Sequence, residues 1–344
     1  MGANVFGQRF QLMSFGESHG VALGAVIDGC PAGVIFDEEL LRREMGRRRP
    51  GQSALTTSRQ EADEVEILSG VYEGRTLGTP IAVMVRNRDQ RSPDYATIAQ
   101  QPRPGHADDV WKEKFGHSDP RGGGRSSGRE TLSRVIGGAL ARMFLRQEVP
   151  PLHVLGMTSQ VGDLLLTEED RRLLAAQDPA SVNVDAHAAR FPSLHAARAE
   201  EKILAAREAG DSLGGAAEIW ITSPPKGLGQ PVFHKLKADL AAAMMSVGAT
   251  SAVEIGAGVE AGAARGQEFH VDAAGDVYGG IRGGIASGET IRVRVSFKPT
   301  SSIHDVAKKG RHDPFIVTRA VPVLEAMAWM VMADHVLWAR TDRV

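Results

Sequence analysis

A glycine run followed by two serines is the local feature best suited to hold an anion. It occurs in GGGRSSGRE at 122–130, directly before a segment with helical spacing. Ser127 and Glu130 have the spacing of a capping box at a helix start. Backbone N–H groups there, the hydroxyls of Ser126 and Ser127 and the guanidinium of Arg125 would suit a phosphate or carboxylate. A Walker A loop is excluded because its Gly-Lys-Ser/Thr ending is missing, and a plain helix cap is the alternative.

Arginines next to glycine or proline form a second pattern. Arg48 is the second of the three arginines in RRRPG at 47–51, where adjacent arginines repel unless water or anions screen them. Similar positions are taken by Arg103, Arg121, Arg125 and Arg311. Guanidinium groups bind carboxylates and phosphates bidentately, so several converging arginines would indicate a small polyanionic ligand. For RRRPG alone, a solvated helix end is the alternative interpretation.

Histidines in irregular segments could move protons. His19 lies in GESHG, His106 in PGHAD and His312 in RHDP. A histidine in a loop can titrate near neutral pH and donate a proton, although a surface or structural role is the alternative for each one. We expect no metal site, because the sequence lacks a His-x-x-x-His or cysteine-rich pattern, and Cys30 beside Pro31 is interpreted as a small core residue.

Charge and composition exclude several classes of protein. The net charge of the 344 residues is -2, and no run of eighteen apolar residues or signal-peptide core occurs. We therefore expect a cytoplasmic protein that binds neither nucleic acid nor membrane. RGGGR and RRRPG raise an RNA-binding alternative, but no aromatic residues are interleaved with them.

Apolar spacing predicts the elements that must position these residues. We predict strands at 5–15, 21–28, 81–85, 218–222 and 291–297, and helices at 37–45, 131–146, 232–245 and 319–340. Two surface helices are expected within 167–210, and 279–288 reads as a glycine-rich loop. The stretch 86–130 has little periodicity, which is more typical of a functional segment than of a linker. No repeat or linker divides the chain, so we expect one domain over 1–344.

Three long motifs, taken together, resemble the chorismate synthase family from end to end. They are GESHGVALGAVIDGCPAG at 16–33, GRSSGRETLSRVIGGAL at 124–140 and RHDPFIVTRAVPVLEAM at 311–327. RPGHAD, GDSLGG and KPTSSI fall between them in the family's order. The resemblance implies an α+β fold, a single-domain β-α-β sandwich with a helical layer between antiparallel sheets, assembled as a homotetramer.

The resemblance also implies a reaction and a cofactor. The reaction is trans-1,4-elimination of phosphate from 5-enolpyruvylshikimate 3-phosphate, which gives chorismate in the shikimate pathway. The cofactor is reduced FMN, which is not consumed in net terms. NADPH is one source of the electrons; because no flavin reductase domain is visible, we expect an outside source instead.

The same resemblance also implies which residues form the site, because they occupy matching positions in the motifs. The catalytic residues implied are His19, His106, Asp313, Ser18 and Ser127: His106 near the leaving phosphate, His19 at the flavin, and the others in a proton relay to the flavin N5. The flavin contacts implied are Arg125, Ser126, Ser127, Gly248, Ala249, Gly283, Lys298, Pro299, Thr300, Ser301, Ser302 and Arg311. Substrate or reduced nicotinamide would be held by Arg48, Arg129 and Arg134.

Four departures from the family pattern affect the expected cofactor site. Ala54 stands where the family usually has arginine, and Gly248 and Ser251 replace an expected asparagine and lysine. The segment after KPTSSI is also short. Lost cations would weaken flavin or nucleotide binding, which raises the alternative of a family member that binds flavin or phosphate without catalysis.

Overall fold

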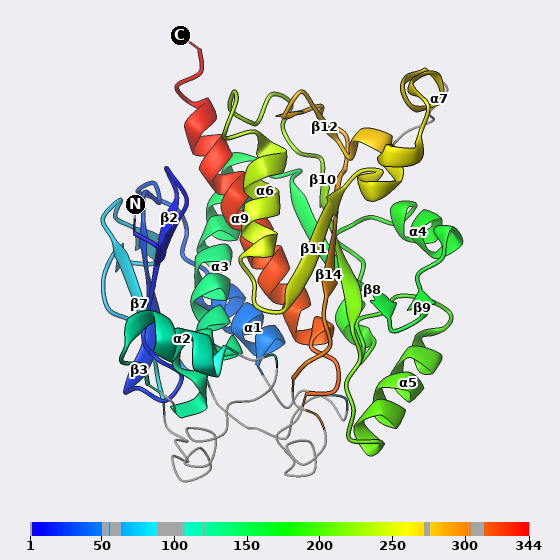
Figure 1. Cartoon of the computed structure of the whole chain (residues 1–344). Coiled ribbons are helices and arrows are strands. Elements are labelled where there is room, and N and C mark those ends of the chain that lie inside the picture. The colour runs from blue at the N-terminus through cyan, green and yellow to red at the C-terminus, as the bar shows by residue number, and fades with distance from the viewer. Residues whose placement is uncertain are drawn as a thin grey trace.

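Two antiparallel sheets enclose a layer of helices in the computed structural model (Figure 1). The structure describes residues 2–49, 55, 63–87, 105, 107–119, 121–271, 276–301, 303 and 313–343. Each large sheet has five strands. This arrangement confirms the expected α+β sandwich with helices between antiparallel sheets.

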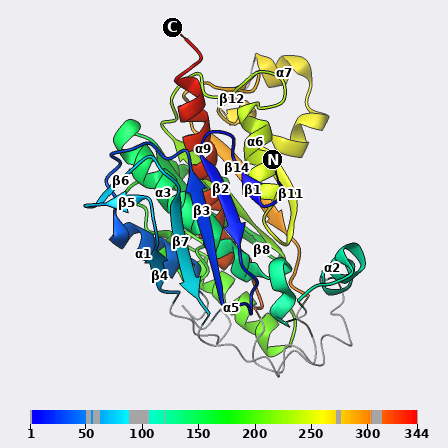
Figure 2. The ribbon, with the colours of Figure 1, turned by 90° about the vertical axis from the view of Figure 1, so that its left-hand side faces the viewer.

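The first sheet carries the N-terminal part of the chain. Its strand order is β1 (Val5–Phe6), β2 (Gln11–Phe15), β3 (Ala22–Asp28), β7 (Ile81–Arg86) and β4 (Val65–Ile67). Figure 2 shows this sheet in front of the helices. Alternate residues of β3, such as Leu23 and Ile27, are buried against the helical layer. A separate hairpin joins β5 (Val71–Tyr72) and β6 (Arg75–Thr76).

The second sheet covers the other side of the helices. Its strand order is β11 (Thr250–Ile255), β14 (Ile291–Phe297), β10 (Gly215–Thr222), β8 (His153–Val161) and β9 (Leu164–Leu165). The predicted alternation in β14 is confirmed, because Ile291, Val293, Val295 and Phe297 are buried while the residues between them are half-buried. The glycine-rich segment forms a small hairpin of β12 (Ile281–Arg282) and β13 (Ile285–Ala286).

Four helices form the central layer, and the others lie outside it. The layer contains α1 (Glu38–Arg48), α3 (Thr131–Glu148), α6 (Leu236–Met245) and α9 (Val317–Ala339). The outer helices are α2 (Asp108–Phe115), α4 (Glu168–Ala175), α5 (Ala196–Glu208) and α7 (Gly266–His270). Short 3-10 turns occupy Arg121–Ser126, Gly128–Glu130, Val184–Ala186, Gly258–Ala263 and Asp276–Tyr278.

Helix α9 forms the middle of the core. By length and composition it is the one helix among the described residues that could cross a membrane, but 94% of its apolar window is buried inside the protein. Core helices of globular proteins share that composition, so the helix is no argument for a membrane span.

The crossing of α3 and α9 predicts a strong effect of one added methyl group. A Cβ at Gly138 would lie 2.4 Å from the Ala326 Cα, which is backbone of the facing helix and cannot rotate away. We expect Gly138→Ala to lower the free energy of unfolding by about 1–3 kcal/mol. In the control Gly46→Ala, also in a helix, the added Cβ has nothing within 4 Å. That change should stabilise by about 0.5–1 kcal/mol. Urea unfolding measures both, and equal stability of Gly138→Ala and wild type would contradict the close crossing.

Candidate active site

The predicted cofactor segments meet beyond the end of β14. The Lys298 backbone N–H donates to the Ala249 carbonyl at 3.1 Å, and the Lys298 ammonium donates to the Gly105 carbonyl at 2.9 Å. The Thr300 hydroxyl donates to the Asp313 carbonyl at 2.9 Å. Figure 1 shows the end of β14 and the first turns of α3 and α9 at the same end of the molecule. The fold thus gathers segments that lie far apart in the sequence.

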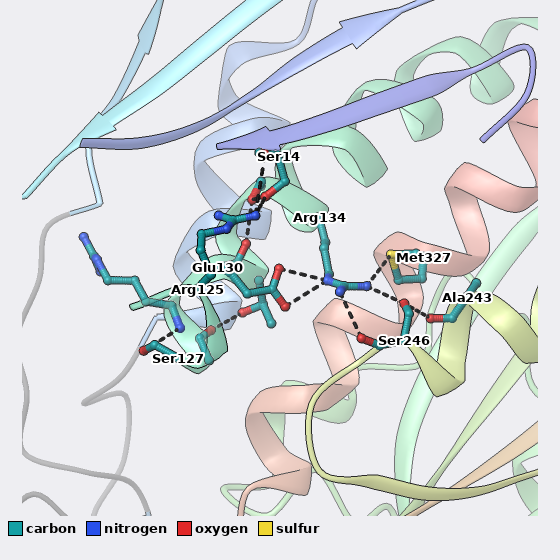
Figure 3. A network of polar contacts seen from close by, with 12 residues as sticks. Ser14, Arg125, Ser127, Glu130, Arg134, Ala243, Ser246 and Met327 are labelled. Carbon is teal, nitrogen blue, oxygen red and sulfur yellow. Dashed lines mark hydrogen bonds and ion pairs between the residues drawn. The ribbon is translucent and has the colours of Figure 1, made fainter. Parts of the chain in front are cut away.

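Arg125 ties the glycine run to the GESHG turn. Its guanidinium donates to the Gly16 carbonyl at 2.8 Å and to the Ser14 hydroxyl at 2.7 Å (Figure 3). The Ser18 backbone N–H donates to the Gly124 carbonyl at 3.3 Å. Two of the three family-like motifs are therefore in direct contact, and part of the donor capacity of Arg125 is used within the protein.

The predicted capping box at Ser127 and Glu130 is wrong. The Ser127 hydroxyl accepts from the Arg129 backbone N–H at 3.4 Å, and α3 starts only at Thr131. A 3-10 turn over Gly128–Glu130 precedes α3, which explains why the accepted N–H is one residue earlier than in a capping box. The Glu130 carboxylate pairs with Arg134 instead, and the Ser126 hydroxyl donates to the Gly123 carbonyl.

Arg48 and Arg129 share one buried carboxylate. Arg48 donates to one oxygen of Asp63 at 3.1 Å, and Arg129 donates to the other at 3.0 Å. The side chains of Arg48, Asp63 and Arg129 are 2%, 1% and 5% exposed. Guanidinium groups bind carboxylates and phosphates bidentately, so this pair of arginines would suit an anionic ligand nearby. Asp63 was not among the predicted site residues.

Arg134 links α3 to the loop after α6. Its guanidinium pairs with Glu130 at 3.1 Å, and it donates to the Ser246 hydroxyl at 2.6 Å and carbonyl at 3.0 Å (Figure 3). That loop continues into Gly248 and Ala249, and Ala249 has a φ of 67°, a left-handed conformation that is costly for a residue with a Cβ. Arg134 thus holds a predicted flavin-binding loop, and its expected contact with substrate or reduced nicotinamide stays a prediction.

His19 and Ser18 are deeply buried at the GESHG turn. His19 is 2% and Ser18 1% exposed. Asp119 lies within electrostatic range of His19: the hydrogen bond from Arg121 lowers the pKa of Asp119 most strongly, and the charge of His19 acts in the same direction. Asp119 was not predicted either, although HSDPR at 117–121 places it beside the glycine run.

Two predicted relay residues carry buried polar atoms that a ligand could satisfy. The Ser18 Oγ and the Asp313 Oδ1 are buried and make no hydrogen bond within the described part of the chain. The other Asp313 oxygen pairs with Arg319 at 2.7 Å. Buried polar atoms are normally hydrogen-bonded, so these two fit a bound group that offers donors and acceptors, as the edge of a flavin ring does.

Gly283 is not brought to the other predicted residues. The adjacent Gly284 accepts from the backbone N–H of Leu236 at the start of α6, whereas Gly248 follows the end of that helix. Ten residues of helix span about 15 Å. Predicted or discussed residues that lie outside the described residues are His106, Ser302, Arg311, Arg103, His312 and Ala54. Among the described residues, no group of three or more His, Cys, Asp or Glu could hold a metal ion.

An ion-pair network anchors α1, which carries Arg48. Arg47 pairs with Glu44, Asp185 and Glu325, and Asp185 also pairs with Arg190. Burial acts to raise the pKa of Asp185, but the charges of Arg47 and Arg190 outweigh it, and the pKa is lowered. The network therefore stabilises the fold above the unfolded-state pKa of about 3.9.

A pH series tests that network. The extra stability of wild type over Asp185→Asn should be full above about pH 5 and disappear as the pH falls through the lowered pKa of Asp185. Urea unfolding of both proteins between about pH 3 and 7 measures it. A stability difference that is independent of pH would contradict this ion-pair assignment.

The sequence is similar to known proteins over nearly its whole length. The family model described as chorismate synthase matches residues 10–337. A chorismate synthase of Bdellovibrio bacteriovorus is 57% identical over 347 residues, covering 100% of both chains. One of Paracoccus denitrificans is 47% identical, covering 99% of this chain and 98% of its own.

The fold is also similar to that of a solved structure. A crystal structure of a chorismate synthase superposes with a TM-score of 0.76 at 30% identity, covering 97% of this chain and 93% of its own. Both the sequence match and the structural match span nearly the whole chain, as the three motifs predicted. The chain therefore belongs to the chorismate synthase family, whose members are lyases of the shikimate pathway.

Proposed function

We propose that this chain converts 5-enolpyruvylshikimate 3-phosphate into chorismate by trans-1,4-elimination of phosphate, with reduced FMN bound beside the substrate. One observation supports it most: the buried Arg48–Asp63–Arg129 cluster bonds the Gly128 carbonyl beside Ser127, and Asn87 joins Arg129 to the Ser18 carbonyl beside His19. The substrate carries a phosphate and two carboxylates, and these are the groups that guanidinium groups bind best. When bound, reduced FMN supplies electron density to the substrate and accepts the ring proton.

The residues that would hold the flavin lie on three loops. They are Ser126 and Ser127 after the glycine run, Ala249 in its left-handed conformation, and Lys298, Pro299, Thr300 and Ser301 after β14. Ser18 Oγ and Asp313 Oδ1, buried without a partner in the described part of the chain, would hydrogen-bond polar edge atoms of such a ring. An absorbance titration with FMN, with and without substrate, tests this binding; absence of a spectral change would count against it.

Some side chains of this protein would stabilise negative charge, and others would transfer protons. Arg48 and Arg129 stabilise the negative charge that develops as phosphate leaves, and their burial keeps that interaction strong. His19 would hold a proton on its imidazole at the reacting site. His106, which follows Gly105 in the sequence, would face the leaving phosphate, and Asp313, Ser18 and Ser127 would pass protons.

The oligomeric state, the compartment and the electron source are also proposed. We propose a single domain over 1–344, a homotetramer, a cytoplasmic setting and an outside source of electrons for the flavin. A net charge of -2 supports the view that neither nucleic acid nor an anionic membrane is a partner.

Gly248 offers a direct test of the departures from the family pattern. A Cβ added there has nothing within 4 Å, so a side chain would enter open space next to Ala249. We expect Gly248→Asn to fold normally and to tighten flavin binding by one hydrogen bond, about 2- to 10-fold in Kd. The control Gly248→Ala fills the same space without an amide and should leave the Kd unchanged. Equal affinities of all three proteins would show that this position does not contact flavin.

The non-catalytic alternative rests on the same departures. Gly248 replaces an expected asparagine, and the Ser251 hydroxyl, where a lysine is expected, donates to the Ser296 carbonyl. Flavin binding without turnover, from folded protein, would support this alternative over the enzyme.

A further inference from the structure

Asn87 makes several hydrogen bonds to the turn that carries His19. It directly follows β7, and its side-chain amide donates to the Gly20 carbonyl at 2.7 Å and the Ser18 carbonyl at 3.2 Å. The same amide approaches the Glu17 carbonyl at 3.5 Å, and the Asn87 backbone N–H donates to the Val21 carbonyl at 3.1 Å. One side chain thus bonds the carbonyls on both sides of His19.

The other end of the Asn87 amide faces the arginine cluster. Its oxygen accepts from the Arg129 Nε at 2.8 Å, and Arg129 pairs with Asp63, which also holds Arg48. A continuous series of hydrogen bonds therefore joins the anion-binding arginines to the backbone around His19. The position needs donors on one side and an acceptor on the other, which a carboxamide supplies and a carboxylate or hydrocarbon does not.

The hydrogen bonds between Asn87 and the turn around His19 are partly shielded from water. Of the two carbonyls that flank His19, that of Ser18 belongs to a buried residue and that of Gly20 to a half-buried one, so water has limited access to replace a lost donor there. The turn also contacts the glycine run through the Ser18 N–H and Gly124. A small shift of the turn would move the His19 imidazole relative to everything bound at the glycine run.

We propose that Asn87 is a positioning residue of the elimination reaction: it fixes the backbone on both sides of His19 and couples that backbone to Arg129. The inference rests on the proposed role of His19. Asn87 itself does not touch the reacting atoms; it acts through the imidazole that it orients. It was not among the residues predicted from the sequence, because a lone asparagine after a strand has no signature.

Asn87→Asp is the sharpest variant, because it keeps the shape and the acceptor for Arg129 while losing both donors. The carboxylate would strengthen the contact with Arg129 but face the carbonyl oxygens of the turn. We expect kcat with reduced FMN to fall about 100-fold, as for a misplaced catalytic group. KM for 5-enolpyruvylshikimate 3-phosphate should stay close to wild type. The control Asn183→Asp changes an exposed asparagine whose side chain makes no capping bond.

A double-mutant cycle with His19→Ala tests the positioning role of Asn87 separately from the role of His19. If Asn87 acts through His19, Asn87→Asp lowers kcat in the wild-type background and has little further effect in the His19→Ala background. An equal loss in both backgrounds, or a loss confined to KM, overturns the positioning role while leaving the role of His19 intact. A wild-type kcat for His19→Ala overturns the role of His19 itself. If circular dichroism shows the aspartate variant unfolded, Asn87→Ser, which keeps one donor, takes its place in the same cycle.

Discussion

Replacing His19 with alanine is expected to lower kcat by about 10²- to 10⁴-fold, the range for removing a general acid or base. His19 is buried, the neighbouring Ser18 N–H bonds Gly124 of the glycine run, and Asn87 bonds the carbonyls that flank His19. A small cavity replaces the side chain, and the buried turn gives water little room to substitute for it. Single-turnover assays with reduced FMN measure the chemical step apart from product release.

The control for this prediction is His195→Ala. His195 is exposed at the start of α5 and makes no capping bond with its side chain. It should leave kcat unchanged. If both variants turned over like wild type, His19 would be structural, and the proton-transfer part of the proposal would have to be abandoned.

Asp63→Ala is expected to cost about 3–5 kcal/mol of unfolding free energy, as for one partner removed from a buried ion pair. Arg48 and Arg129 would lose a carboxylate that they share in a buried place. Urea unfolding at neutral pH measures the loss. Asp63→Asn keeps the shape and should lose less, because its amide oxygen still accepts one hydrogen bond.

A surface ion pair provides the matched comparison. Glu38 pairs with Arg42 at 2.6 Å, but their side chains are 46% and 68% exposed. Glu38→Ala should change stability by about 0–1 kcal/mol. Similar losses for Glu38→Ala and Asp63→Ala would mean that the buried cluster is not the anchor described above.

The sequence predicted the elements whose periodicity is simple. The alternation over 291–297 and the helical spacing over 131–146 correspond to β14 and α3 within two residues. Strand β8 was missed because nearly all of its residues are buried on both faces, so it shows no alternation. Helix α2 was missed inside a segment interpreted as irregular, and α6 starts at Leu236 rather than 232. The residue at 232 has a φ of 61°, which cannot continue a helix.

The candidate site was predictable where it lies within motifs and not where it depends on tertiary contacts. His19, Ser18, Ser127 and Asp313 follow from family-like motifs, and their roles remain predictions. Asp63, Asn87 and Asp119 are single polar residues in other segments, and only the folded chain shows what they contact. Some residues selected as ligand contacts also serve the protein: Arg125 bonds the GESHG turn, and Arg134 bonds Ser246.

An anaerobic turnover assay tests the central claim most directly. Purified protein is mixed with 5-enolpyruvylshikimate 3-phosphate and photochemically reduced FMN, and chorismate and phosphate are followed over time. We expect both products to appear in equal amounts, and only when the flavin is reduced. No turnover at saturating reduced flavin, from folded protein that binds FMN, would contradict it and leave a flavin-binding member of the family that has lost catalysis.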